Sequence, residues 1–113
     1  MRIFYALAAL IVLGCHVPAA LAADASVTIS SPRDGAKFRP STEVDVVYEA
    51  TLGPNGNHVH LYVDNGKAVL LRALKGSHSV GTLVEGAHKI CINVVNAAHT
   101  PIGAQACVNV SVQ

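Results

Sequence analysis

Two histidines separated by one residue open the stretch HVHLYVD, residues 58–64, in a chain of 113 residues. The stretch alternates in hydropathy, which is typical of a β-strand with one buried face. Residues two apart in a strand point to the same side, with Cα atoms about 6.6 Å apart, so His58 and His60 share one face. Two imidazoles at this spacing can turn towards one ion, each offering a nitrogen at about 2.0 Å. The pattern therefore predicts two ligands of a transition-metal site.

Two ligands are seldom enough to hold an ion, so this prediction needs further donors near the pair. By parity, Val59, Leu61 and Val63 form the buried face, which places the two histidines on the outer, solvent-facing side of the strand. The preceding turn contains Asn55 and Asn57, whose amide oxygens are minor donor candidates. The competing interpretation is a pair of solvated surface histidines that bind nothing.

Two other histidines have different predicted roles. His88 follows the sequence EGA at the start of an alternating stretch and shares parity with Ile90 and Ile92. We expect it to lie at the edge of the core and to bond a nearby backbone group. His78, within KGSHSVG, has no partner nearby in the sequence, and we expect it to be exposed.

The cysteines predict a structural disulfide. Cys15 lies in the N-terminal apolar segment, which leaves Cys91 and Cys107. Two cysteines in an exported chain usually form a disulfide, because the compartment is oxidising. Both are opposite in parity to the apolar residues of their stretches, so a bridge is feasible if the two strands are adjacent and antiparallel. It would close a loop of about 15 residues and contribute about 3 kcal/mol. A redox-active pair is the alternative, although such pairs usually have closer spacing.

The N-terminal segment has the layout of a cleaved export signal. Arg2 precedes an apolar run over residues 3–13, and the small residues Ala20 and Ala22 follow it. Cleavage after Ala22 would leave residues 23–113, enough for one domain with one modest core.

A signal peptide over residues 1–22 predicts a periplasmic or secreted protein. An uncleaved membrane anchor is disfavoured, because the apolar run is too short for about 30 Å of hydrocarbon. Lipidation at Cys15 also stays open, since VLGC loosely resembles a bacterial lipobox. Without Arg2, 7 of the 8 Lys and Arg residues remain against 7 Asp and Glu. A near-neutral domain with no basic stripe argues against nucleic acid and anionic membranes as partners.

The fold class follows from the alternation that dominates the chain after residue 25. Turn clusters separate the alternating stretches TEVDVVYEA, HVHLYVD, HKICINVVN and ACVNVSV. Seven or eight short strands of this kind predict an all-β fold, an antiparallel β-sandwich. The stretches SPRDGAKF, LYVDNGKAV and LVEGAHKICINVVNA resemble the bacterial immunoglobulin-like or fibronectin III-like domains of exported proteins. One departure is that the chain has no tryptophan and no cysteine in its expected strand B.

The resemblance implies a third metal ligand. In an immunoglobulin-like sandwich strand C lies beside strand F, so the loop between F and G reaches the same end as the start of C. His99 lies in that loop, NAAHTPIG, and joins His58 and His60 as a predicted ligand. Imidazoles suit copper and zinc alike, and no thiolate is free to favour zinc if the disulfide forms. We therefore expect copper rather than zinc.

No residue pattern indicates catalysis. Ser77 and Ser79 flank His78, but adjacent residues of a strand point to opposite faces, so neither serine is placed for activation. The sequence predicts a small exported, non-enzymatic domain that binds a metal ion through surface histidines. The alternative is a protein-interaction or structural module without a metal, whose partner is another protein.

Overall fold

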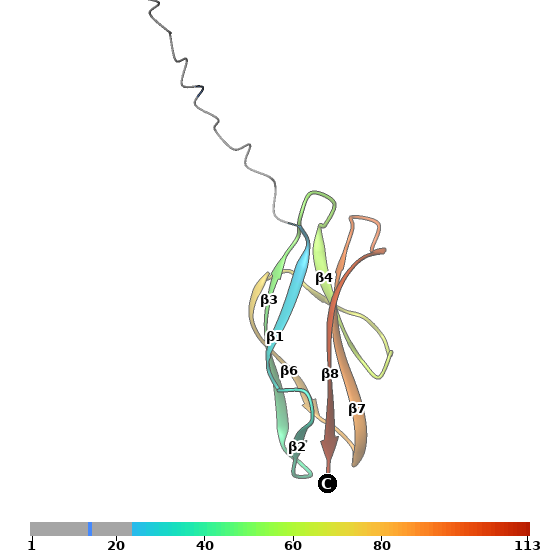
Figure 1. Ribbon diagram of the computed structural model, residues 1–113. Coiled ribbons are helices and arrows are strands. Elements are labelled where there is room, and N and C mark those ends of the chain that lie inside the picture. Colours follow the sequence, from blue (N-terminus) through green and yellow to red (C-terminus); the bar gives the residue numbers. More distant parts are fainter. Residues whose placement is uncertain (1–13, 15–23) are drawn as a thin grey trace, which may run out of the picture.

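Two β-sheets pack face to face in the computed structural model, which describes Gly14 and residues 24–113 (Figure 1). One sheet has the strand order β1–β3–β6, and the other has the order β2–β8–β7–β4–β5. The strands are β1 Ser26–Ser31, β2 Ala36–Phe38, β3 Glu43–Thr51, β4 His58–Val63, β5 Val69–Leu71, β6 Lys75–Thr82, β7 Gly86–Val95 and β8 Pro101–Val112. The predicted all-β sandwich of seven or eight strands is confirmed.

The predicted signal peptide lies outside the described residues apart from Gly14, as do its cleavage point and Cys15. Within the part of the chain that the structure describes, no helix has the length and apolar character needed to cross a membrane.

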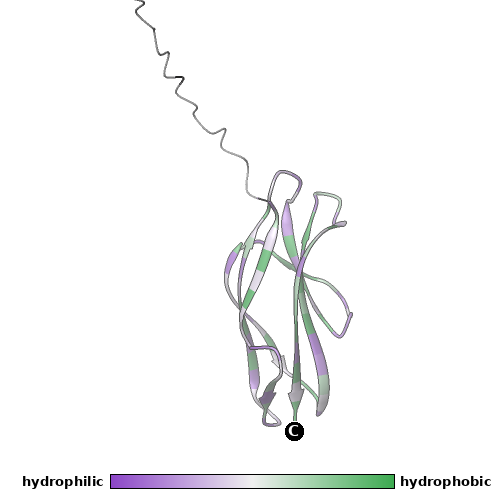
Figure 2. Cartoon of the chain, viewed as in Figure 1, coloured by the Kyte–Doolittle hydropathy of each residue, from purple (hydrophilic) through white to green (hydrophobic). Residues whose placement is uncertain are grey.

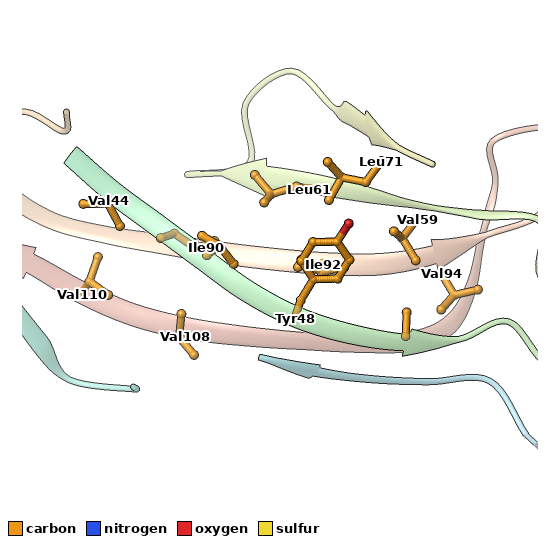
Figure 3. Packing of buried hydrophobic residues seen from close by; sticks show 12 residues of the cluster. Val44, Tyr48, Val59, Leu61, Leu71, Ile90, Ile92, Val94, Val108 and Val110 are labelled. Carbon is orange, nitrogen blue, oxygen red and sulfur yellow. The ribbon is translucent and has the colours of Figure 1, made fainter. Parts of the chain in front are cut away.

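The core lies between the sheets and follows from strand alternation. In β3, Val44, Val46, Tyr48 and Ala50 are buried, while the residues between them are exposed (Figure 2 shows this alternation of hydropathy along the strands). They pack against inward-facing residues of the other sheet, as seen from close by in Figure 3. Burying one such side chain contributes about 1.5–3 kcal/mol, so this face fixes the register of each strand.

Strand β4 lies between β5 and β7, in the adjacency that the immunoglobulin-like order implies. Leu61 pairs in register with Ile92 of β7, and both are fully buried. The β3–β4 and β7–β8 connections therefore meet at one end of the sandwich, opposite the C-terminus (Figure 1). This arrangement brings the start of β4 and the loop over residues 96–100 together.

One detail differs from the expected antiparallel pattern. Strand β2 pairs with β8 in parallel, because the chain leaves β1 and continues in the same direction into the other sheet. Gly35 makes this crossing with a φ of 84°, a left-handed conformation that glycine adopts readily. Strand β5 is also short, with only three residues, because the chain leaves the five-stranded sheet after Leu71 and enters β6 in the other.

The disulfide Cys91–Cys107 is present, as predicted, between β7 and β8. The two cysteines are direct partners in the antiparallel register, and their Cα atoms are 4.1 Å apart. Cys91 also pairs with Tyr62 of β4, so the bridge lies on the outer face of the five-stranded sheet, away from the core. It ties the strand that leads into the β7–β8 loop to the strand that leaves it.

His88 is buried at the end of β7 that is remote from this loop. Its Nε2 donates to the carbonyl oxygen of Val84 at 2.6 Å, the kind of backbone bond that was expected. Its Nδ1 donates to a carboxylate oxygen of Asp64 at 2.6 Å, a partner that sequence reasoning missed. Because both partners are acceptors, only the doubly protonated ring satisfies both bonds. The hydrogen bond that His88 donates to Asp64 is the main cause that raises the pKa of His88.

Asp64 also holds the end of β4 against β7. Its other carboxylate oxygen accepts from the backbone N–H of Lys89 at 2.8 Å, and its own N–H donates to the Lys89 carbonyl at 2.8 Å. The hydrogen bond with His88 is the main cause that lowers the pKa of Asp64.

His78, expected to be exposed, is half-buried, because it pairs in register with Val46, whose side chain faces the core.

Asp64→Asn is expected to change how stability depends on pH. Since the folded-state pKa of His88 is raised, its contribution is fully present below the unfolded value of about 6.5 and is lost as pH rises through the folded value. Asp64 has a lowered pKa, so its contribution is present above its unfolded value of about 3.9 and is lost on further acidification. We expect Asp64→Asn to lower the free energy of unfolding by about 1 kcal/mol near pH 6, a small figure because the carboxylate is close to half exposed.

Urea denaturation of wild type and Asp64→Asn, at pH values from about 6 to 8.5 and with a chelator present, measures this difference. The gap between the two proteins should narrow as pH rises. A gap that is constant across the range would show that the pair is not charged in the folded protein.

Candidate metal centre

Three imidazole nitrogens face one another at the end of the sandwich where β4 begins. His58 Nε2 is 2.9 Å from His60 Nε2 and 3.0 Å from His99 Nδ1, and the third side, His60 Nε2 to His99 Nδ1, is 3.2 Å. The structure thus brings together the three residues named from the sequence as ligands. They are called the three-histidine cluster below.

His58 and His60 point to the outer face of the sheet, as parity predicts, but they are buried there. Their exposed fractions are 8 % and 6 %, so the expectation of surface histidines was wrong for these two. The rings cover one another and the His99 ring covers both, with centroids 4.7 Å from His58 and 5.3 Å from His60. The ring of Tyr62 also lies beside the ring of His60, in an edge-to-face arrangement. His99 itself is exposed.

The outward nitrogens of the two buried rings are held by neighbouring side chains. His58 Nδ1 donates to the amide oxygen of Asn57 at 2.9 Å, which leaves the lone pair of the neutral ring on Nε2. His60 Nδ1 lies 3.2 Å from the hydroxyl of Tyr62. Such partners fix the orientation and tautomer of a ligating histidine. Asn57, a candidate oxygen donor from the sequence, thus orients a ring instead of facing the cluster.

The turn that leads into β4 needs glycine at position 56. A Cβ there would overlap the carbonyl oxygen of Leu52 and lie 2.8 Å from a methyl group of Val94. The close approach lets the N–H of Asn57 donate to the carbonyl of Val95 at 2.8 Å, which anchors the start of β4 on the end of β7. The backbone at His58 is therefore fixed to β7, the strand that leads into the β7–β8 loop.

Asn96 organises the loop that carries His99. Its side-chain oxygen accepts from the backbone N–H groups of Ala98 and Thr100, each at 3.0 Å. Its carbonyl accepts from the N–H of His99 at 2.9 Å, and its own N–H donates to the carbonyl of Thr100 at 2.9 Å. His99 has a φ of 63°, a left-handed conformation that histidine adopts more often than most residues do. Asn96 thus holds the backbone that places the third nitrogen.

Asn96→Ala is expected to weaken metal binding without unfolding the domain. The variant loses both side-chain bonds of the turn, so His99 samples other positions; losing such an orienting residue costs about 10- to 100-fold in metal affinity. Competition titration against a chromophoric chelator measures the change. Asn55→Ala is the matched control, because among the described residues no hydrogen bond joins Asn55 to the cluster, and its affinity should equal that of wild type. Wild-type affinity in Asn96→Ala would show that the turn does not need this side chain.

The chemistry of the cluster favours a cation between the rings. Three nitrogens at these distances can share one proton between two of them, which leaves at least one lone pair directed at another nitrogen. Burial lowers the pKa of His58, with smaller contributions from His99 and Arg72. Burial likewise lowers the pKa of His60, with contributions from His58 and His99. Neutral imidazoles are the form that binds metal ions, so the environment of both rings favours ligation.

The cluster has the geometry of a site that can hold a metal ion, since one ligand atom from each residue lies within 4.8 Å of the others. Sequence reasoning named its three members but missed the roles of Asn96 and Tyr62. An asparagine at the start of a loop is a turn signal, and it points to Asn96. Tyr62 shares strand parity with His58 and His60, which is the only signal for its contact with His60.

Comparisons with known proteins bear on the fold alone. No family model matches the sequence, and no curated protein matches it. Among solved structures, the fibronectin(III)-like modules of Clostridium thermocellum CbhA match with a TM-score of 0.62 and 17% identity, over 76% of this chain and 93% of that one. A CARDB domain from Pyrococcus furiosus, solved in complex with di-metal ions, matches with a TM-score of 0.51 and 18% identity, over 79% and 92% of the two chains. The chain has the fold of an immunoglobulin-like, fibronectin III-like domain.

Proposed function

We propose that the protein binds one transition-metal ion, copper in preference to zinc, through His58, His60 and His99. The observation that carries the proposal is the triangle of ring nitrogens with sides of 2.9, 3.0 and 3.2 Å. An ion about 2.0 Å from all three nitrogens would sit about 1 Å out of their plane. Three ligands on one side of the ion leave at least one coordination position for water or another ligand.

The donor set supports copper. Both cysteines of the domain are in the disulfide, so the site offers imidazole without thiolate. For such sites the affinity order of divalent ions peaks at Cu²⁺. Nitrogens about 2.0 Å from one ion are about 2.8 Å apart at a right angle and about 3.3 Å apart at the tetrahedral angle. The observed distances of 2.9, 3.0 and 3.2 Å lie between these two values, so the preference for copper rests on the donor set.

We also propose that the protein acts outside the cytoplasm, as a periplasmic or secreted copper carrier or buffer without catalytic activity. The signal-like residues 1–22 support export, and the disulfide suits an oxidising compartment. The CARDB domain of similar fold was solved in complex with di-metal ions, so a sandwich of this kind is compatible with bound metal ions.

Elemental analysis and electron paramagnetic resonance of the domain, purified without a histidine tag and loaded with Cu²⁺, test the proposal. We expect one copper ion per chain after removal of excess metal. The spectrum should have the tetragonal form, with hyperfine coupling to about three nitrogens. Competition titrations should rank Cu²⁺ above Zn²⁺. A protein that retains no copper, or whose signal shows no bound nitrogen, contradicts the proposal.

His78→Gln is the matched control for nonspecific binding to histidine. His78 belongs to β6 in the other sheet, so the variant removes one imidazole and leaves the three-histidine cluster intact. It should bind one copper ion with the wild-type affinity and spectrum. A protein that binds no ion but purifies with one defined protein partner would favour the alternative, an interaction module, which the fold shared with fibronectin(III)-like modules supports.

A further inference from the structure

The three ligands of the proposed site are not equivalent. His58 and His60 belong to one strand, are buried, and have their Nδ1 atoms 2.9 Å and 3.2 Å from the polar groups of Asn57 and Tyr62. His99 comes from a loop and is exposed. Within residues 24–113, no hydrogen bond holds its second nitrogen, Nε2. Two ligands are therefore locked in place, and the third is free to turn away.

The same asymmetry determines how an incoming molecule reaches the ion. Of the three rings only that of His99 is exposed, so an incoming molecule would meet the cluster at His99. The backbone of the β7–β8 loop is held by the four hydrogen bonds of Asn96, so His99 leaves the cluster by rotation of its side chain and not by opening of the loop. The remaining coordination position of the ion can accept a new donor before His99 departs.

We propose that the protein is a metal carrier that hands over its ion by ligand displacement at His99; this inference rests on the proposed function. An acceptor with an exposed nitrogen or sulfur donor binds the ion first at its open position. His99 then turns into solvent, and further acceptor donors replace His60 and His58. The ion keeps its charge throughout, and no bare ion enters solution. The acceptor therefore takes part in the step that sets the rate.

Stopped-flow transfer of Cu²⁺ from the loaded protein to 4-(2-pyridylazo)resorcinol tests this order of events. With the chelator in excess, the observed rate constant should rise in proportion to chelator concentration, about tenfold for a tenfold increase. A rate constant independent of chelator concentration would mean that the ion leaves unaided, and it would overturn the inference while leaving copper binding intact. A protein that cannot be loaded with copper removes the proposed function and this inference together.

Two variants identify which ligand leaves first. His99→Ala removes the mobile ligand and should raise the second-order transfer rate constant by at least tenfold. Asn55→Ala, the affinity control above, leaves the three-histidine cluster intact, and its rate constant should stay within about twofold of the wild-type value. A His99→Ala rate constant within about twofold of wild type would show that a strand ligand leaves first, which contradicts the proposal. Both positions lie outside the core, and circular dichroism checks that each variant is folded.

Discussion

Replacing His58 and His60 together by alanine is expected to abolish stoichiometric copper binding. The variant leaves one imidazole, on a loop, where wild type offers three nitrogens within 3.2 Å of one another. The fixed spacing of the two strand ligands is what makes the cluster a chelating site, since their positions are determined before the ion arrives. We expect the affinity to fall by at least about a thousandfold, or about 4 kcal/mol. Isothermal titration calorimetry with Cu²⁺ measures the loss.

The control for this variant must separate lost ligands from lost packing. Both rings are buried, so alanine leaves unfilled space on the outer face of the sheet. His58→Gln with His60→Gln fills most of that space with a poorer ligand, and it should lose binding to a similar extent. The free energy of unfolding of each variant is measured alongside without metal. Copper affinity within about tenfold of wild type in either folded variant would show that the ion binds elsewhere.

Removing the disulfide is expected to cause the largest loss of stability. Cys91 and Cys107 are 16 residues apart in sequence, and closing a loop of that size in the unfolded chain corresponds to about 3 kcal/mol. A domain of this size has a net stability of about 5–15 kcal/mol, so the loss is a large part of the total. Cys91→Ala with Cys107→Ala should therefore shift the urea midpoint to a much lower concentration.

The disulfide variant also separates the stability of the domain from the proposed copper binding. The bridge joins β7 to β8, whereas the ligands belong to β4 and to the β7–β8 loop, which Asn96 holds through its own hydrogen bonds. Under conditions in which the variant is folded, we expect it to bind one copper ion as wild type does. A loss of stability below about 1 kcal/mol would show that the unfolded chain does not gain the expected freedom.

Strand alternation was sufficient to predict most of the fold. The parity of Val44, Val46 and Tyr48 gave the inner face of β3 correctly, because a sheet with one buried face tolerates no slip of register. Parity also placed both cysteines on an outer face, where they pair. The short length of β5 was not predictable, because the apolar Ala73 and Leu74 follow closely after Leu71 although the chain is by then crossing between sheets.

The candidate site was only partly predictable. Strand spacing placed His58 and His60 on one face, whereas His99 depended on the adjacency of β4 and β7 that the immunoglobulin-like resemblance implied. Burial of the pair was missed, because strand parity predicts which side of the sheet a residue faces but does not show that the three rings cover one another there. The contact between Asp64 and His88 was missed because 24 positions separate them and carboxylates at strand ends are usually solvated.

The placement of the donor set on the outside of a single sheet has a consequence for engineering and for divergence. The proposed ligands and their hydrogen-bonding partners come from β4, the residue just before it and the short β7–β8 turn, and none belongs to the β1–β3–β6 layer. Interior residues can therefore be exchanged without touching the ligands, and the ligands can be lost without loosening the interior. The His-Val-His segment of β4, together with the Asn96-initiated turn between β7 and β8, should be transplantable into a β-sandwich scaffold that binds no ions.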